Sequence, residues 1–229
     1  MEHLRARGAA ESAVPVRMVR DVLIVDDHPL MCEALSITLT AAFGLGRVRT
    51  APSLAAAEAS IRSDGAPDAV VLDLNLPDVA GVEGVVSLCA RSPGAPVTVI
   101  SAEVDQGMVA AVIGAGARGY IGKSMPRAEI IAAFRAMWDG QTVLPDGYDP
   151  EVEGDEAGDL ARVFSTLTPQ QMNILRLICQ GRPNKIISYE LSIAEATVKT
   201  HVAAIMSKIN VRNRTQAALM ASKARLFSR

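Results

Sequence analysis

The stretch VVLDLNLPDVAG, at residues 70–81, decides the fold of the first two-thirds of the chain. Its first residues belong to a short apolar run, expected as a strand over residues 69–72 and lacking the alternation of a half-exposed strand. Asp73 ends this run, and Pro77 and Gly81 punctuate a loop before a helical pattern begins. Four other short apolar runs share this form. They occupy residues 22–25, 48–50, 97–100 and 119–121.

Helical spacing of apolar residues follows each of the five predicted strands. Ser53 and Pro126 stand where a helix N-cap or a first-turn residue is expected. Consecutive strand–helix units predict an α/β fold with a doubly wound five-stranded parallel sheet, whose functional crevice lies at the carboxyl ends of the strands. The predicted helices cover residues 30–41, 54–62, 82–90, 107–115 and 127–138.

The chain has 229 residues, which is long enough for two modest domains with separate cores. No apolar run approaches the ~18 residues of a membrane span, and the first 20 residues lack the apolar stretch of a signal peptide. We therefore expect a cytoplasmic protein without membrane association. Cys32, Cys89 and Cys179 are an odd number, lie far apart and form no C-x-x-C pair, so we expect buried free thiols.

The charge is distributed unevenly along the chain. Residues 165–229 carry ten Lys and Arg against two acids, a net charge of +8, whereas residues 21–162 carry nine against 21, a net charge of −12. This asymmetry indicates nucleic acid as a partner of the C-terminal part alone. We expect a mobile tail at residues 1–20, the α/β domain at 21–140, an exposed acidic linker at 141–164 and a helical domain at 165–229.

Polar side chains follow four of the five predicted strands. Asp26 and Asp27 end the first strand, Asp73 ends the third, Ser101 ends the fourth and Lys123 follows the fifth. A parallel sheet brings these strand ends to one crevice. Crowded carboxylates repel one another, and a hard cation such as Mg²⁺ relieves that repulsion. One carboxylate can then attack phosphorus while the cation, a Lys and a hydroxyl neutralise the transferred group.

Over residues 21–140 the sequence resembles the receiver domain of response regulators. The motifs that match are VLIVDDH, VVLDLNLPDVAG, TVISAE and GARGYIGK. The resemblance implies that Asp73 accepts a phosphoryl group from a sensor histidine kinase. It also implies that Asp27 and Asp73 ligate Mg²⁺ directly with the backbone carbonyl of Asn75, and that Asp26 acts through water.

The same resemblance implies roles for three further side chains. Ser101 would donate a hydrogen bond to the new phosphoryl group, and Lys123 would form an ion pair with it. Tyr120 matches the aromatic residue that turns inward as Ser101 moves. We interpret His28, which follows the two acids and starts a helix, as a loop or cap residue rather than a metal ligand.

A phosphatase of the haloacid-dehalogenase type is the alternative from another class, since it also uses an Asp nucleophile with Mg²⁺, a hydroxyl and a Lys. That chemistry normally needs a second Asp two residues after the nucleophile. Asn75 occupies this position and cannot exchange a proton. The nucleophile also follows the third predicted strand and not the first, so a regulator and not an enzyme is favoured.

From Leu167 onward the pattern is purely helical and resembles the LuxR-type helix-turn-helix domain over residues 167–221. The stretch is LTPQQMNILRLICQGRPNKIISYELSIAEATVKTHVAAIMSKINVRNRTQAALMA. A short connection at residues 192–194 has helix-turn-helix spacing, and the second helix would enter the major groove of double-stranded DNA. The predicted helices cover residues 169–180, 184–191, 195–210 and 214–223.

The less apolar side of the recognition helix carries the candidate DNA contacts. The resemblance makes Lys199 and Thr200 candidates for base edges. Ala203 stands where many members carry a polar or basic residue, so specificity would rely partly on DNA shape. Candidates for phosphate or nearby contacts are Asn184, Lys185, Thr197, His201, Lys208 and Arg212.

The expected mechanism is a population shift. Phosphorylation of Asp73 would favour a receiver surface at residues 107–115 and 127–138 that releases the DNA-binding domain or pairs two receivers. A homodimer would then bind repeated half-sites, paired through residues 214–223, with RNA polymerase as a further partner. The alternative is a constitutive DNA-binding or protein-interaction module whose receiver is only structural.

Overall fold

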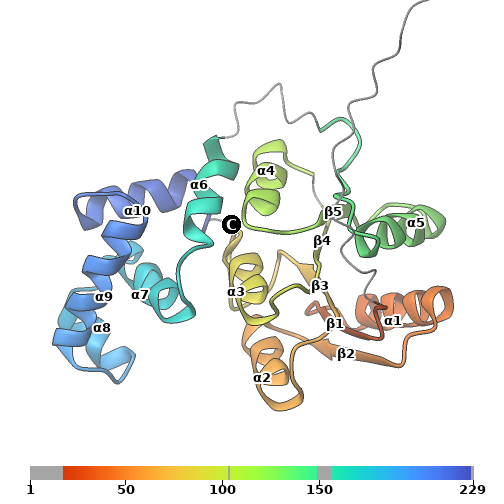
Figure 1. Ribbon diagram of the computed structural model, residues 1–229, viewed down its shortest axis with the longest axis horizontal. Coiled ribbons are helices and arrows are strands. Elements are labelled where there is room, and N and C mark those ends of the chain that lie inside the picture. Colours follow the sequence, from red (N-terminus) through yellow and green to blue (C-terminus); the bar gives the residue numbers. More distant parts are fainter. Residues whose placement is uncertain (1–17, 103, 149–155, 228–229) are drawn as a thin grey trace, which may run out of the picture.

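The computed structural model describes residues 18–102, 104–148 and 156–227, and it has a five-stranded parallel sheet in the order β2-β1-β3-β4-β5 (Figure 1). Leu72 pairs with Val25 of β1, and Asp73 pairs with Ile100 of β4, so the carboxyl ends of the central strands are level. The predicted doubly wound sheet is confirmed. The strands are β1 (Asp21–Val25), β2 (Arg47–Ala51), β3 (Ala69–Asp73), β4 (Val97–Ser101) and β5 (Gly119–Gly122).

Helices cover both faces of the sheet, which is why its strands are apolar on both sides (Figure 1). One face carries α1 (Pro29–Phe43) and α5 (Arg127–Trp138), whose apolar side chains close one core. The other face carries α2 (Leu54–Asp64), α3 (Glu83–Arg91) and α4 (Gln106–Gly114). Each predicted helix is present, with ends shifted by at most a few residues.

The C-terminal part is helical, as predicted, and its helix-turn-helix is formed by the second and third of the four predicted helices. Thr168 and Gln171 form a reciprocal capping box at the start of α7. Ser192, with φ of 52°, adopts the left-handed conformation in the turn between α8 and α9. The helices are α7 (Pro169–Cys179), α8 (Asn184–Glu190), α9 (Glu195–Lys208) and α10 (Arg214–Lys223).

Part of the segment expected to be an exposed acidic linker is packed against the rest of the chain. It contains a further helix, α6 (Glu156–Phe164), and Phe164 is fully buried. Val143, earlier in the same segment, forms a parallel bridge with Gly119 of β5. The acidic composition conceals a short amphipathic pattern in α6, which explains why the sequence suggested a linker. Residues 149–155 lie outside the described residues, as do residues 1–17 of the expected N-terminal tail.

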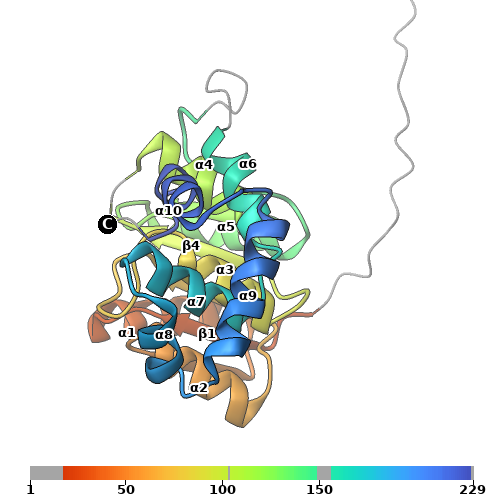
Figure 2. The ribbon, with the colours of Figure 1, turned by 90° about the vertical axis from the view of Figure 1, so that its left-hand side faces the viewer.

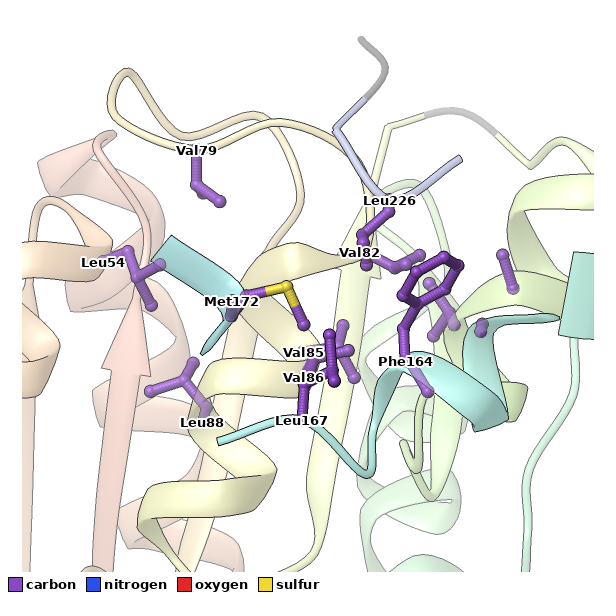
Figure 3. Close-up of a cluster of buried hydrophobic side chains, with 14 of the residues drawn as sticks. Leu54, Val79, Val82, Val85, Val86, Leu88, Phe164, Leu167, Met172 and Leu226 are labelled. Carbon is purple, nitrogen blue, oxygen red and sulfur yellow. The ribbon is translucent and has the colours of Figure 1, made fainter. Parts of the chain in front are cut away.

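The helical domain packs against the face of the α/β domain formed by α3 and α4 (Figure 1). Side chains of α3 meet those of α6, α7 and the C-terminal segment in one buried cluster (Figure 3). Gly114 of α4 and Gly158 of α6 are in backbone contact, since a Cβ at Gly114 would lie 2.1 Å from the Gly158 oxygen. The cluster includes Val82, Val85, Val86, Phe164, Leu167, Met172 and Leu226.

The three cysteines are free, as expected from their spacing. Cys32 is buried, whereas Cys89 and Cys179 are half-buried. Burial raises the pKa of the Cys89 thiol to about 11, so this side chain is protonated at neutral pH. Within the residues that the structure describes, no helix is both long and apolar enough to span a membrane.

Candidate functional site

Asp26, Asp73 and Lys123 meet at the carboxyl ends of the central strands. The Nζ atom of Lys123 lies 2.9 Å from Oδ2 of Asp26 and 2.8 Å from Oδ2 of Asp73. Both carboxylates are almost fully buried, with exposed fractions of 2% and 1%. The backbone N–H of Lys123 donates to the Ser101 carbonyl oxygen at 2.7 Å, which fixes the loop after β5 beside the end of β4. The sheet therefore brings the carboxylates of two predicted site residues to the ammonium group of a third.

The ammonium of Lys123 is stabilised in its charged form. Burial alone would lower its pKa, but the hydrogen bonds and charges of Asp73 and Asp26 outweigh burial and raise the pKa above its ordinary value. The side chain is therefore a fixed cation at neutral pH. It compensates part of the negative charge that two buried carboxylates bring to the crevice.

A cluster of acidic side chains at this crevice has the donor set of a hard-cation site. Ligand atoms of Asp26, Asp27, His28 and Asp73 all lie within 4.8 Å of one another. Carboxylate oxygens are the ligands that Mg²⁺ prefers, so the residues present fit this cation. Asp27 is exposed, and its Oδ1 atom lies 2.8 Å from Nδ1 of His28. His28 is the N-cap residue of α1, but its side chain makes no cap hydrogen bond and points to the acids instead.

A hollow of about 500 Å³ opens beside this cluster. Asp27, Asn75, Ser101 and Tyr120 are part of its lining. Ser101 and Tyr120 are 4% and 1% exposed, so the predicted aromatic residue is already buried. The backbone N–H of Asn75 donates to Oδ1 of Asp73 at 3.3 Å, which places Asn75 directly beside the predicted nucleophile. The predicted receiver residues are thus brought together.

The predicted DNA-contacting residues are dispersed over an exposed surface. Thr197, Lys199 and Thr200 of α9 are exposed, whereas Val198 and Ile205 of the same helix are buried. This separation matches the prediction that the candidate DNA contacts lie on the less apolar side of the helix. Lys199 pairs with Glu195 one turn away, at 3.2 Å, and that pair leaves the lysine mostly exposed. Figure 2 shows α9 along the outside of the helical domain.

The other predicted DNA-contacting residues differ in their exposure and in their hydrogen bonds within the domain. Lys185 and Arg212 are exposed, and His201 and Asn184 are half-buried. Lys208 is engaged within the domain, because its ammonium donates to the Thr166 carbonyl oxygen at 2.9 Å and to Oε1 of Gln171 at 3.0 Å. The sequence could not show this, since Thr166 and Gln171 lie about forty residues earlier in the chain.

Comparison with known proteins agrees with both halves of this geometry. The family model of the response regulator receiver domain matches residues 22–135, and that of the luxR family of bacterial regulatory proteins matches residues 165–221. The glycerol metabolism activator of Pseudomonas putida is 36% identical over 211 residues, covering 87% of this chain and 94% of that protein. The chain belongs to the LuxR-type response regulators.

Two other relatives show how far the similarity extends. The nitrate/nitrite response regulator NarL of Escherichia coli K12 is 30% identical over 209 residues, covering 90% of this chain and 96% of that protein. A structure of RcsB from Salmonella enterica serovar Typhimurium, bound to a promoter, covers 90% of this chain and 99% of that chain. Its TM-score is 0.53 at 20% identity, so it shows the fold alone.

As a response regulator with a receiver and a LuxR-type domain, the protein is a DNA-binding transcription regulator of a two-component system and not an enzyme. The phosphatase alternative is thereby set aside. The structure also argues against the phosphatase, because Asp73 ends the third strand and not the first, and Asn75 stands two residues after it.

The contacts between the two domains were missed by sequence reasoning. Arg176 of α7 forms an ion pair with Glu83 of α3, whose exposed fraction is only 3%. Burial raises the pKa of the Glu83 carboxyl more than the hydrogen bonds of Arg176 lower it. Arg225, after α10, forms a second ion pair with Asp105, the N-cap residue of α4. No local pattern marked these four residues, because charged residues on helix faces usually point to solvent.

Proposed function

We propose that Asp73 accepts a phosphoryl group from a sensor histidine kinase, and that its phosphorylation controls DNA binding by the C-terminal domain. The observation that carries this proposal is the ammonium of Lys123, held between the buried carboxylates of Asp73 and Asp26. A buried pair of acids that shares one fixed cation at the carboxyl ends of parallel strands has the composition of a phosphoryl-transfer site.

Different residues of the chain have different roles in the phosphoryl transfer. A carboxylate oxygen of Asp73 forms a bond to phosphorus while the bond from phosphorus to the donor's imidazole nitrogen breaks, and that nitrogen keeps the electron pair. Lys123 neutralises one phosphoryl oxygen, and Ser101 donates a hydrogen bond to another. Tyr120 lines the same hollow as Ser101, and in this proposal it changes position when Ser101 moves.

Asp26, Asp27, Asp73 and the carbonyl of Asn75 would hold Mg²⁺. When bound, this cation supplies neutralisation of the phosphoryl oxygens during transfer. The acidic cluster supports this assignment, since its ligand atoms lie within 4.8 Å of one another.

Replacing Asp73 by Asn tests the nucleophile. We expect Asp73→Asn to abolish labelling by radioactive acetyl phosphate in the presence of Mg²⁺, because an amide cannot form the acyl phosphate. Asp139→Asn, at an exposed acid after α5, should label like the wild type. Labelling that persists in Asp73→Asn would show that another residue is the acceptor.

For the DNA-binding domain, we propose that α9 enters the major groove, with Lys199 and Thr200 near base edges. Asn184, Lys185, Thr197, His201 and Arg212 would lie near the phosphates. Lys208 would reach DNA only by leaving Gln171 and Thr166, so its first role is to brace α9 against α7. The exposure of Thr197, Lys199 and Thr200 supports this assignment.

In this proposal the protein acts in the cytoplasm as a homodimer when phosphorylated, and contacts RNA polymerase at promoters. DNA affinity measured at fixed salt, with and without acetyl phosphate, separates this switch from a constitutive DNA-binding module. A switch predicts different affinities for the two states. Equal affinities would leave the receiver with a structural role only.

A further inference from the structure

The DNA-binding domain places one of its own side chains in the hollow beside the acidic cluster, together with predicted site residues. Arg225 lines the same hollow of about 500 Å³ as Asp27, Asn75 and Ser101, although it lies about 150 residues after Asn75 in the chain. It occupies the turn that ends α10, where its φ of 51° is left-handed. The N–H of Leu226 bonds back to the carbonyl oxygen of Ala221, which closes this turn.

Backbone hydrogen bonds hold this turn against the receiver. The N–H groups of Val82 and Glu83, at the start of α3, donate to the carbonyl oxygens of Arg225 and Leu226 at 3.2 and 3.1 Å. Val82 is the N-cap residue of α3 and makes no side-chain cap hydrogen bond, so the C-terminal turn supplies the acceptors that a cap would otherwise provide.

A glycine makes this close approach feasible. Gly81 lies near the end of the loop that follows Asp73, between β3 and α3, and a Cβ there would lie 2.0 Å from the carbonyl oxygen of Arg225. Gly81 also has a positive φ of 63°. The C-terminal turn is therefore fitted closely to the backbone of the loop between β3 and α3.

The guanidinium of Arg225 is placed to respond to charge in the hollow. Its Nη1 atom lies 2.5 Å from Oδ1 of Asp105, which is half exposed and caps α4 through the N–H of Met108. A guanidinium has five N–H donors in a planar fork that suits phosphate oxygens. A phosphoryl group brings about −1.5 to −2 charges and three strong acceptors into the hollow.

We propose that Arg225 is a phosphoryl-binding residue supplied by the DNA-binding domain, so that phosphorylation tightens the docking of this domain on the receiver. The inference rests on the proposed role of Asp73 as phosphoacceptor. Because Arg225 reaches the hollow only in the docked arrangement, any attraction between it and the phosphoryl group stabilises docking by the same amount. This sign is opposite to a release of the DNA-binding domain.

When the helical domain is packed on the receiver, as in this structure, the exposed side of α9 remains accessible to DNA. Thr197, Lys199 and Thr200 are exposed in it, and α8 and α9 lie on the side of the helical domain that is farther from the sheet (Figures 1 and 2). Phosphorylation would therefore fix the orientation of an accessible reading helix on its receiver. Two phosphorylated copies would then present their reading helices at a defined spacing.

Amide hydrogen exchange at Val82 and Glu83 in the full chain measures docking directly, since these N–H groups donate to the C-terminal turn. With acetyl phosphate and Mg²⁺, or with beryllofluoride as a stable analogue, we expect exchange to slow by roughly tenfold, as one charge-assisted hydrogen bond predicts. Arg225→Ala should remove this response and Arg225→Lys should restore part of it. Faster exchange on phosphorylation of the wild type would overturn the inference.

Two control variants separate the possible outcomes. Arg162→Ala removes an exposed charge on α6 that pairs with Asp159, and should respond like the wild type. Gly114→Ala favours the helix of α4, but its Cβ would clash with the Gly158 backbone, so it should undock the domain without touching the hollow. We expect fast exchange in Gly114→Ala and no response to phosphorylation.

Labelling with acetyl phosphate distinguishes failure of this inference from failure of the proposed function. If the wild type is labelled at Asp73 and Arg225→Ala responds in exchange as the wild type does, Arg225 is not a phosphoryl-binding residue. If the wild type is not labelled at all, the proposed function fails and the inference fails with it.

Discussion

The crevice of the receiver and the helix α9 hold their charged side chains in opposite environments, buried in the first and exposed in the second. In the crevice, Asp26 and Asp73 are buried and share Lys123, and these residues come from three different strand ends. On α9, Lys199 and its neighbours come from one helix and remain exposed. A phosphoryl-transfer site needs charges that are already desolvated and oriented, whereas DNA supplies its own dense charge and needs accessible partners.

Because of this difference, we expect mutations at the two sites to affect stability differently. Loss of a charge in the crevice should disturb folding as well as chemistry, because the remaining charges are buried. Loss of a charge on α9 should change DNA binding and leave stability almost unaltered.

The largest effect is expected at Lys123. Lys123→Met leaves Asp26 and Asp73 as neighbouring buried carboxylates without their cation, so we expect the free energy of unfolding to fall by about 3 kcal/mol and phosphoryl transfer to be lost. Urea unfolding at neutral pH with and without Mg²⁺ measures this, and added Mg²⁺ should restore part of the stability. An unchanged unfolding midpoint would contradict the compensating role of Lys123.

A smaller effect is expected at Lys199. Lys199→Ala should weaken specific DNA binding by about 1–3 kcal/mol if the side chain reaches a base edge. Lys185→Ala is the matched variant for a phosphate contact, and should weaken binding to all sequences while reducing the salt slope by about one. Fluorescence anisotropy over a series of salt concentrations separates the two. A Lys199→Ala variant that loses affinity equally on all sequences would place Lys199 at a phosphate.

The smallest effect is expected at the capping box of α7. Thr168→Ala removes the hydroxyl that accepts from the Gln171 N–H, and should lower the free energy of unfolding by about 1 kcal/mol. Thr168→Ser keeps the hydroxyl and should be close to the wild type. Since this cap lies in the helical domain, labelling of Asp73 should not change. A change in labelling would contradict this separation and show that the start of α7 influences the chemistry of the crevice.

Much of the fold and of the candidate site was predictable from particular residues. The apolar runs that end in Asp26, Asp73 and Ser101 located three parallel strands, and the parallel sheet then required their ends to meet. Helix α6 was not predicted, because its acidic surroundings hid the apolar positions Leu160, Ala161 and Phe164. The hydrogen bonds of Lys208 within the helical domain were not predicted either, since the sequence does not distinguish a free lysine from a hydrogen-bonded one.

The surface expected to respond to phosphorylation, at residues 107–115 and 127–138, stays a prediction. Helix α4 does lie at the contact between the domains, where it packs against α6. Helix α5 lies on the opposite face of the sheet with α1 (Figure 1). The expected surface therefore consists of one helix from each face of the sheet, and both of these helices contact the edge strand β5.

The sequence by itself determined the order of the strands and of the helices other than α6, the meeting of Asp26, Asp73 and Lys123 at the strand ends, and the exposed side of α9. These features depend on periodicity and on strand ends, which are local properties of the chain. Only the tertiary structure decided that the helical domain packs on α3 and α4, and that Arg225 lines the hollow beside the acidic cluster. The physical reason is that an apolar stripe predicts burial without specifying its partner, and that contacts over 100 residues apart leave no periodic signal.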